Sequence, residues 1–102
     1  MSGDPVLSML GLCKRAGKLK SGAFSVEEAV KGKKAYLVIV VCDASDRTKK
    51  THRDMCAYYS VPLYEYGTRD TLSAAIGQTE RVSAAVLDEN FANELIKRLS
   101  KV

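Results

Sequence analysis

The chain of 102 residues contains no tryptophan, two prolines, one histidine and three cysteines. Its longest apolar run covers eight residues, 35–42, whereas a helix that spans a membrane needs about 20. The cysteines, Cys13, Cys42 and Cys56, are odd in number and far apart, which argues against a disulfide framework. The first residues show no secretion signal. The sequence therefore predicts a cytoplasmic protein in a reducing compartment, without a membrane span.

Motifs for catalysis, metal binding and phosphate transfer are also missing. His52 stands in a stretch rich in lysine and arginine, so we predict an ordinary exposed residue rather than a general base. The cysteines form no C-x-x-C pair and lie within apolar patterns, which argues against zinc. The run Gly11–Lys18 has five residues between its glycines and leucine after its lysine, so it is not a P-loop. We therefore expect no enzyme, no metal, no cofactor and no small-molecule substrate.

Charge is distributed unevenly along the chain. Residues 1–53 hold eleven Lys and Arg against five acidic residues, a net charge of +6. Residues 54–102 hold five against seven, a net charge of −2, which completes the overall +4. A basic half is typical of a surface that binds nucleic-acid phosphates, and also of solvated helix faces. Charge alone leaves both interpretations open.

Helical and strand patterns alternate along the chain. Helical patterns extend from Asp4-Pro5 to a stop at Gly17, from a cap at Ser25 to Gly32, from Asp46 to Tyr59, from Arg69 to Ile76, and from a cap at Asp88 to Leu99. Strand patterns cover residues 18–21, 35–42, 61–66 and 82–87. This alternation predicts an α/β fold, a three-layer α/β/α sandwich with a mixed sheet of about four strands. We expect one domain over residues 1–102, with 18–21 as an edge strand.

A basic stretch surrounds the junction between the first predicted strand and the second predicted helix. Residues 14–34 hold seven Lys and Arg against two acidic residues, and Gly22 stands at the junction. A helix N-terminus exposes unpaired N–H groups that suit a phosphate. Lys18 and Lys20 flank the junction, and we expect them to contact phosphates. A solvated rim is the alternative.

The chain contains, in this order, Gly17-Lys-Leu-Lys-Ser-Gly22, Gly32-Lys-Lys-Ala-Tyr-Leu-Val-Ile-Val-Val-Cys-Asp43, Tyr58-Tyr-Ser-Val-Pro62 and Leu72-Ser-Ala-Ala-Ile-Gly77. These runs resemble the kink-turn-binding ribosomal-protein family of archaea and eukaryotes. Residues 10–18 and 81–89 are most similar to its small bacterial members. The resemblance extends from about Leu10 to Leu99. It implies an α/β/α sandwich that binds RNA internal loops with tandem sheared G·A pairs.

The resemblance also implies a recognition element at the predicted junction. Gly22 and Ala23 match the glycine and the small residue of the family. Phe24 replaces an Asn or Lys, Ser25 a Glu or Gln, and Glu28 a basic residue. For Ser25 and Glu28, a reciprocal helix capping box is better supported than base readout. For Phe24, stacking on an unpaired base and packing of the helix are equally supported.

Further family positions near the RNA are the strand end 43–45, Arg69 and the loop 78–82. That loop is apolar in relatives and faces the extruded base of the kink, whereas Thr79, Glu80 and Arg81 make it polar here. The basic run 47–53 either extends the phosphate footprint or serves solubility. The candidate RNA-binding residues are Lys18, Lys20, Ser21, Gly22, Ala23, Phe24, Ser25, Glu28, Asp43, Ala44, Ser45, Arg69, Arg81 and Val82.

These observations predict a non-catalytic, monomeric RNA-binding protein. The expected target is a structured RNA such as a kink-turn-like internal loop, in a ribosome or another ribonucleoprotein. The alternative is a protein-interaction module on the same scaffold that has lost specific RNA reading, which Phe24, Ser25 and Glu28 favour.

Overall fold

The computed structural model describes residues 4–101. Its helices are α1 (Pro5–Arg15), α2 (Ala23–Lys31), α3 (Asp46–Tyr59), α4 (Arg69–Ala75) and α5 (Glu89–Leu99). Its strands are β1 (Leu19–Ser21), β2 (Leu37–Val40), β3 (Leu63–Glu65) and β4 (Ser83–Val86). Each predicted helix and strand is present in the predicted order. No helix of the described chain is both long and apolar enough to cross a membrane.

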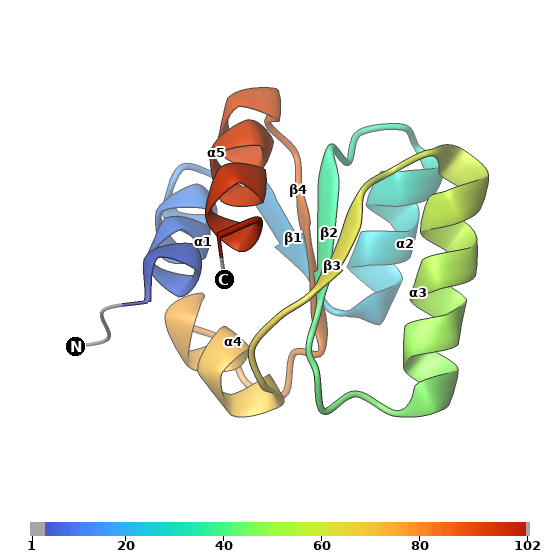
Figure 1. The fold of residues 1–102 in the computed structure, drawn as a ribbon, viewed down its shortest axis with the longest axis horizontal. Coiled ribbons are helices and arrows are strands. Elements are labelled where there is room, and N and C mark those ends of the chain that lie inside the picture. Colours follow the sequence, from blue (N-terminus) through green and yellow to red (C-terminus); the bar gives the residue numbers. More distant parts are fainter. Residues whose placement is uncertain (1–3, 102) are drawn as a thin grey trace.

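The four strands form one mixed sheet in the order β1-β4-β2-β3. β4 is antiparallel to both β1 and β2, whereas β3 is parallel to β2. β1 is therefore an edge strand, as predicted. The register pairs Ser21 with Ala84 and Val40 with both Ser83 and Glu65. As a result, the C-terminal ends of β1, β2 and β3 and the N-terminal end of β4 meet at one end of the sheet, the lower end in Figure 1.

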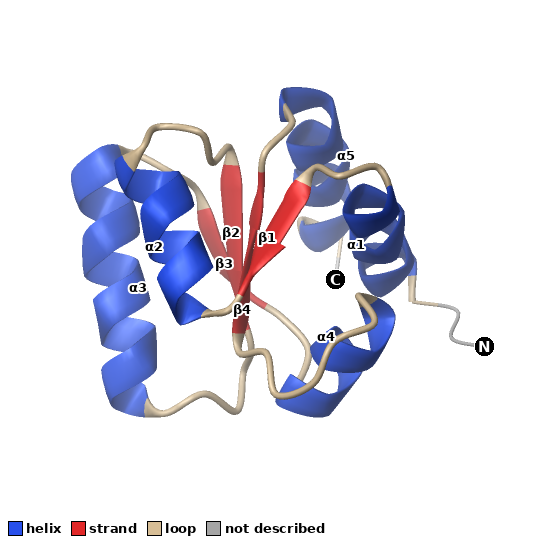
Figure 2. Ribbon diagram, turned by 180° about the vertical axis from the view of Figure 1, so that it is seen from behind, coloured by secondary structure: helices blue, strands red, loops and turns tan. Residues whose placement is uncertain are grey.

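Helices cover both faces of the sheet, which confirms the three-layer sandwich. α2 and α3 lie on one face, and α1, α4 and α5 lie on the other (Figures 1 and 2). The first three side chains of β2 alternate between the two resulting cores: Val38 packs with α2 and α3, whereas Leu37 and Ile39 pack with α1 and α5. All residues of β2 and β4 are buried, as expected for strands covered on both sides.

Local capping fixes the helix starts that the sequence predicts. Asp4 Oδ1 accepts hydrogen bonds from the backbone N–H groups of Val6 and Leu7 at 2.9 and 3.0 Å. Its Oδ2 accepts the Tyr66 hydroxyl at 2.7 Å, which ties α1 to the chain after β3. This hydrogen bond, with burial, raises the pKa of Tyr66 to about 12. Side chains also cap α3 and α5, as predicted.

His52 is buried, which corrects the prediction of an exposed residue. Its side chain is 3% exposed and lies between α3 and β4. Nδ1 donates to the Thr48 carbonyl oxygen at 2.8 Å, so Nε2 accepts the Ser83 hydroxyl at 2.9 Å. His52 shares the inner face of α3 with Cys56, four residues later. That apolar spacing, rather than the neighbouring lysines, is the signal for its burial.

The three cysteines are free thiols, of which Cys13 and Cys56 are buried. Burial raises the pKa of both thiols to about 11. Cys42 is exposed, in contrast to its prediction within an apolar strand, because β2 ends at Val40 and the chain turns toward α3.

Candidate nucleic-acid interface

Four segments meet at the end of the sheet where β1 ends and β4 begins: the β1–α2 junction, the segment after β2, the segment after β3 and the α4–β4 loop. We call this end of the sheet the interface end. The Gly22 N–H donates to the Ser83 carbonyl at 3.0 Å, which joins the β1–α2 junction to β4. The Val41 N–H donates to the Val82 carbonyl at 2.9 Å. The Cys42 N–H donates to the Gly67 carbonyl at 2.8 Å. The candidate segments from distant parts of the sequence are therefore held side by side.

Gly22 forms the sharp transition from β1 into α2. Its backbone adopts φ 92° and ψ 146°, a conformation that glycine alone adopts readily. The Gly22 carbonyl accepts the Val26 N–H at 2.9 Å, so the helix begins at Ala23. The capping box predicted from Ser25 and Glu28 is therefore wrong, because Ser25 already lies inside the first helical turn.

The N-terminus of α2 differs from those of the other helices. Asp4, Ser45, Thr68 and Asp88 cap α1, α3, α4 and α5 with their side chains. No side chain caps α2 in the described chain. Its first N–H groups thus lack an acceptor from a capping side chain and carry the positive end of the helix dipole. Such a helix start suits an anion.

Arg81 lies directly beside this helix start. Its Nε donates to the Ser21 hydroxyl at 3.1 Å, and its Nη2 donates to the Gln78 side-chain oxygen at 3.1 Å. Its Nη1 donates to the Thr79 carbonyl at 3.2 Å. A Cβ on Gly22 would stand 3.8 Å from the Arg81 side chain. Arg81 therefore couples the β1–α2 junction to the α4–β4 loop and fixes a cation there.

Ser73 and Gln78 support Arg81; the sequence does not indicate Ser73, and it indicates Gln78 only as the first residue of the loop 78–82. The buried Ser73 hydroxyl accepts the Arg81 backbone N–H at 2.8 Å. Gln78 holds the guanidinium, as described above. These contacts depend on the fold of the α4–β4 loop, and no local sequence pattern indicates them.

The segment after β2 shapes the interface end rather than presenting free donors. Asp43 Oδ1 accepts the backbone N–H of Arg69 at 2.9 Å and so joins this segment to α4. Ala44 is buried, and the Ser45 hydroxyl accepts the Thr48 N–H at 3.1 Å. Val82 is half-buried beside the segment. Arg69 is exposed, as its predicted role requires.

The remaining candidates divide between the two ends of the sheet. Phe24 is 71% exposed on the first turn of α2, so its ring does not staple the helix to a neighbour. Ala23 is exposed at the start of the same turn. Lys20, Ser25 and Glu28 line a groove beside α2. Lys18 lies at the opposite end of β1 from Gly22, because its carbonyl accepts the Leu87 N–H.

Comparison with known proteins places the chain in a family. The sequence model of the Ribosomal protein L7Ae/L30e/S12e/Gadd45 family matches residues 4–96. The chain belongs to this family. The RNA-binding protein YlxQ of Bacillus subtilis (strain 168) is 41% identical over 99 residues, which cover 97% of this chain and 99% of that protein. The RNA-binding protein YlxQ of Enterococcus faecium is 34% identical over 88 residues, which cover 86% and 84%.

Solved structures share the fold of this L7Ae/L30e-family chain. A protein of unknown function from Bacillus halodurans C superposes with a TM-score of 0.91 at 38% identity, over 95% of this chain and 98% of the other. The Giardia lamblia 15.5kD RNA binding protein superposes with a TM-score of 0.79 at 23% identity, over 95% and 83%. The second similarity supports the fold alone, because its sequence identity is low.

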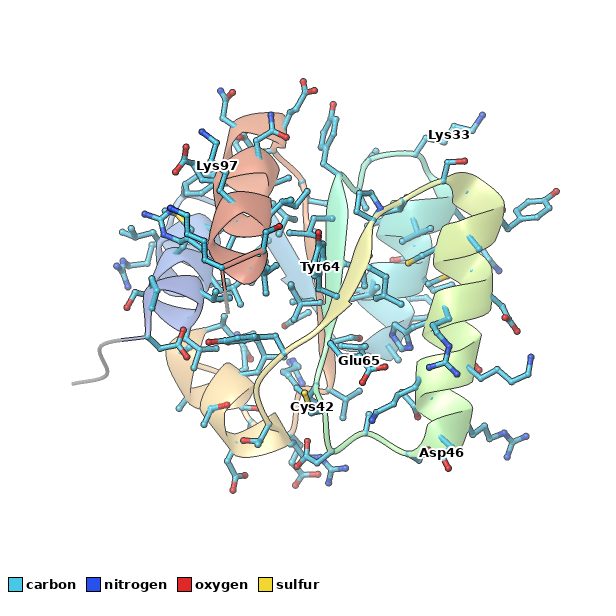
Figure 3. All side chains as sticks on the ribbon, viewed as in Figure 1. Lys33, Cys42, Asp46, Tyr64, Glu65 and Lys97 are labelled. Carbon is cyan, nitrogen blue, oxygen red and sulfur yellow. The ribbon has the colours of Figure 1, made fainter. Side chains whose placement is uncertain are left out.

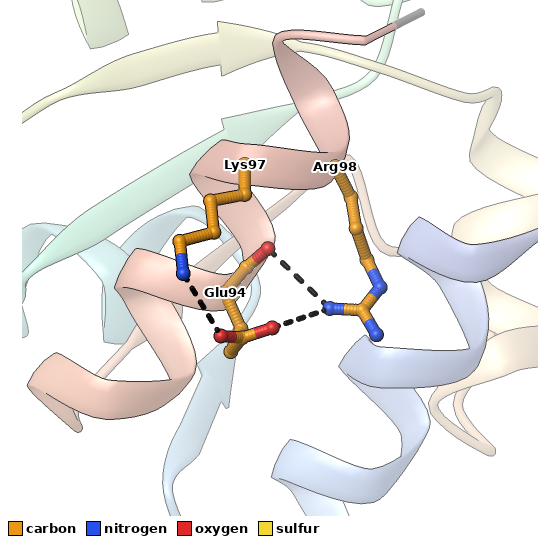
Figure 4. A network of polar contacts seen from close by, with 3 residues as sticks. All are labelled: Glu94, Lys97 and Arg98. Atoms are coloured by element: carbon orange, nitrogen blue, oxygen red, sulfur yellow. Dashed lines mark hydrogen bonds and ion pairs between the residues drawn. The ribbon is translucent and has the colours of Figure 1, made fainter.

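Several basic residues of α3 and α5 in this L7Ae/L30e-family chain are paired with carboxylates. On α3, Lys49 and Arg53 contact Glu65 at 3.4 and 3.6 Å, and Lys50 contacts Asp54 at 2.6 Å. On α5, Glu94 bridges Lys97 and Arg98 (Figure 4), and the Arg98 hydrogen bond contributes most to a lowered pKa of Glu94. The basic run 47–53 therefore contributes less positive potential than its composition suggests.

Other cations remain without a carboxylate partner in the described part of the chain. None of them lies within 4.0 Å of an Asp or Glu oxygen. They include Lys20, Lys34, Arg69 and Arg81. Figure 3 shows Cys42 and Asp46 at the interface end, and Lys33 and Lys97 at the far end. Within the described residues, Arg69 and Arg81 thus provide unpaired charge at the interface end, and Lys20 and Lys34 provide it along the β1 side of α2, whereas Lys33 is unpaired at the far end.

The buried polar pair of this L7Ae/L30e-family chain does not form a catalytic site. His52 contacts the Ser83 hydroxyl, and both side chains are buried under α3. A nucleophilic serine must reach a substrate, which this packing prevents. The described residues contain no group of three or more His, Cys, Asp and Glu side chains arranged to hold a metal ion.

Proposed function

We propose that this chain binds a structured RNA through its interface end and acts without catalysis. The observation that carries the proposal is the open N-terminus of α2, flanked by Arg81 and Lys20, neither of which has a carboxylate partner in the described chain. Curated relatives with 41% and 34% identity are named RNA-binding proteins, which supports the same function.

The groups at the interface end suit different parts of an RNA. The first N–H groups of α2 and the helix dipole attract a backbone phosphate. The Arg81 guanidinium is held in place by three protein acceptors and adds a fixed positive charge. The exposed Phe24 ring offers a flat surface to an unpaired base, a common contact in RNA recognition.

The proposed target is a kink-turn-like internal loop in a ribosomal or other ribonucleoprotein RNA, bound by one monomer. The family resemblance of Gly22 and Ala23 supports this choice. Phe24, Ser25 and Glu28 depart from the family pattern. We therefore expect stacking and phosphate contacts to contribute more to affinity than hydrogen bonds to the G·A pairs.

Titration of the protein with a kink-turn RNA tests this proposal. The comparison RNA has the same length and stems, with its sheared G·A pairs replaced by Watson–Crick pairs. We expect tighter binding to the kink-turn RNA, and at least 10-fold weaker binding for Arg81→Ala. The matched control is Arg53→Ala, because Arg53 lies on α3 and is paired with Glu65 of β3. Equal binding of the two RNAs would contradict kink-turn recognition.

A protein-interaction module is the second candidate, because the exposed Phe24 also suits a protein partner. The two functions differ in their response to salt, since phosphate contacts weaken steeply as salt rises. Filter binding with total cellular RNA distinguishes them. Binding no stronger than that of an equally basic control protein would favour the protein partner.

A further inference from the structure

A groove lies between α2 and the edge strand β1, on the β1 side of the interface end. Its volume is about 310 Å³. It extends from the first turn of α2 to the segment after that helix. The residues that line it are Lys20, Ser25, Glu28, Ala29, Gly32, Lys34 and Leu87.

The charged side chains of this groove are not neutralised by one another. Lys20, Lys34 and Glu28 line the same space, yet neither lysine has its Nζ within 4.0 Å of a Glu28 carboxylate oxygen in the described chain. On the neighbouring face of α2, Lys31 and Glu27 do pair, at 2.6 Å. The groove therefore offers two ammonium groups and one carboxylate to a ligand.

The floor of the groove is apolar. Ala29 is buried, and Leu87 is half-buried at the end of β4. Gly32 adds no side chain, so a flat group can approach the helix closely. A fitting ligand therefore has an anionic part for the lysines, a planar face for the floor and a donor edge for the carboxylate of Glu28.

A nucleotide combines these three features, and its base is set by Glu28. An ionised carboxylate only accepts hydrogen bonds. Guanine presents two adjacent donors, N1–H and N2–H, to a bidentate acceptor. Adenine, cytosine and uracil place an acceptor beside each donor, which repels the second carboxylate oxygen. The chemistry therefore favours guanine.

We propose that this groove binds one unstacked guanine nucleotide of the RNA, with its phosphates on Lys20 and Lys34 and its base edge on Glu28. The proposal rests on the RNA-binding function proposed above. It gives Glu28 a role that the family pattern, which has a basic residue there, does not provide. The groove adjoins the interface end through Ser25, so an RNA strand bound at the start of α2 can continue directly into the groove.

The test uses four RNA trinucleotides that differ only in the central base: UGU, UAU, UCU and UUU. Binding to ¹⁵N-labelled protein is followed by NMR. We expect UGU to bind about 10-fold more tightly than the others, in line with one bidentate contact. It should shift the backbone amides of Glu28, Ala29 and Gly32. Glu28→Gln should reduce the preference to less than about 3-fold.

Two further variants separate the base contact from the phosphate contacts. Lys34→Gln should weaken binding of all four trinucleotides equally, because it removes a phosphate contact and no base contact. Glu27→Gln is the matched control, since Glu27 faces Lys31 outside the groove, and it should retain the UGU preference.

Equal affinity for the four trinucleotides, or an unchanged preference in Glu28→Gln, would overturn the proposal. So would the failure of all four to bind at millimolar concentration while a structured RNA still binds. Neither result affects RNA binding at the interface end. Absence of salt-sensitive binding to structured RNA would instead refute the proposed function.

Discussion

Replacement of Gly22 by alanine tests whether the interface end depends on the conformation of this one residue. The Gly22 backbone lies at φ 92° and ψ 146°, where a side chain is strained. Apart from its two neighbours in the chain, a Cβ at Gly22 would meet no atom closer than 3.8 Å, so the cost comes from the backbone and not from a clash. Such strain costs about 1–3 kcal/mol.

That free energy corresponds to a measurable change in thermal stability. For a domain of this size, 1 kcal/mol lowers the Tm by about 4–8 °C, so Gly22→Ala should lower it by at least about 4 °C. Urea unfolding followed by circular dichroism measures the free energy of unfolding directly. RNA affinity should fall as well, because the backbone conformation of Gly22 orients the start of α2.

Gly17→Ala provides the matched control for this prediction. Gly17 follows α1 with φ 74°, in the left-handed region, and a methyl group added there would meet no neighbouring atom within 4 Å. The cost there is about 1–2 kcal/mol, without an effect on the start of α2. A Gly22→Ala protein with wild-type stability and wild-type RNA affinity would refute the reasoning.

Three further substitutions test separate contacts. Phe24→Ala should weaken RNA binding by about 1–3 kcal/mol and leave unfolding unchanged, since the ring is exposed; unchanged affinity would rule out stacking. Tyr66→Phe removes the hydrogen bond to Asp4 and should cost about 0.5–1.5 kcal/mol of stability in urea. Because the folded-state pKa of Tyr66 is raised from 10.0 to about 12, the contribution of its neutral hydroxyl is complete below pH 10. It is lost as the pH rises toward 12, and the Phe variant should lack that loss. His52→Leu leaves the buried Ser83 hydroxyl without its acceptor and should cost about 1–3 kcal/mol; wild-type stability would show that this pair is dispensable.

The sequence predicts the parts of the fold that depend on local signals. The caps Asp4, Ser45 and Asp88 mark their helices because each cap bonds within three residues of itself. The apolar run 35–42 predicts the buried central strand β2, because a continuous apolar run is also a local signal. The meeting of the four candidate loops at one end does not follow from the alternation of strands and helices, because it depends on the antiparallel direction of β4.

The candidate site is predicted less completely, because its details depend on contacts between distant segments. The start of α2 is set by the positive φ of Gly22, so the Ser25–Glu28 pattern misleads. Neutralisation of Lys49 and Arg53 depends on Glu65 of another strand. The position of Lys18 depends on the direction of β1, which carries it away from the interface end.

The salt dependence of RNA binding tests the central claim most directly. A triple variant, Lys20→Gln, Arg69→Gln and Arg81→Gln, removes three cations of the interface end. The control triple variant, Lys50→Gln, Arg53→Gln and Lys97→Gln, removes the same charge from ion pairs on α3 and α5. For a kink-turn RNA, the slope of log Kd against log salt should fall by about 2–3 in the first variant and stay near wild type in the second. Equal slopes in both variants would contradict RNA binding at the interface end.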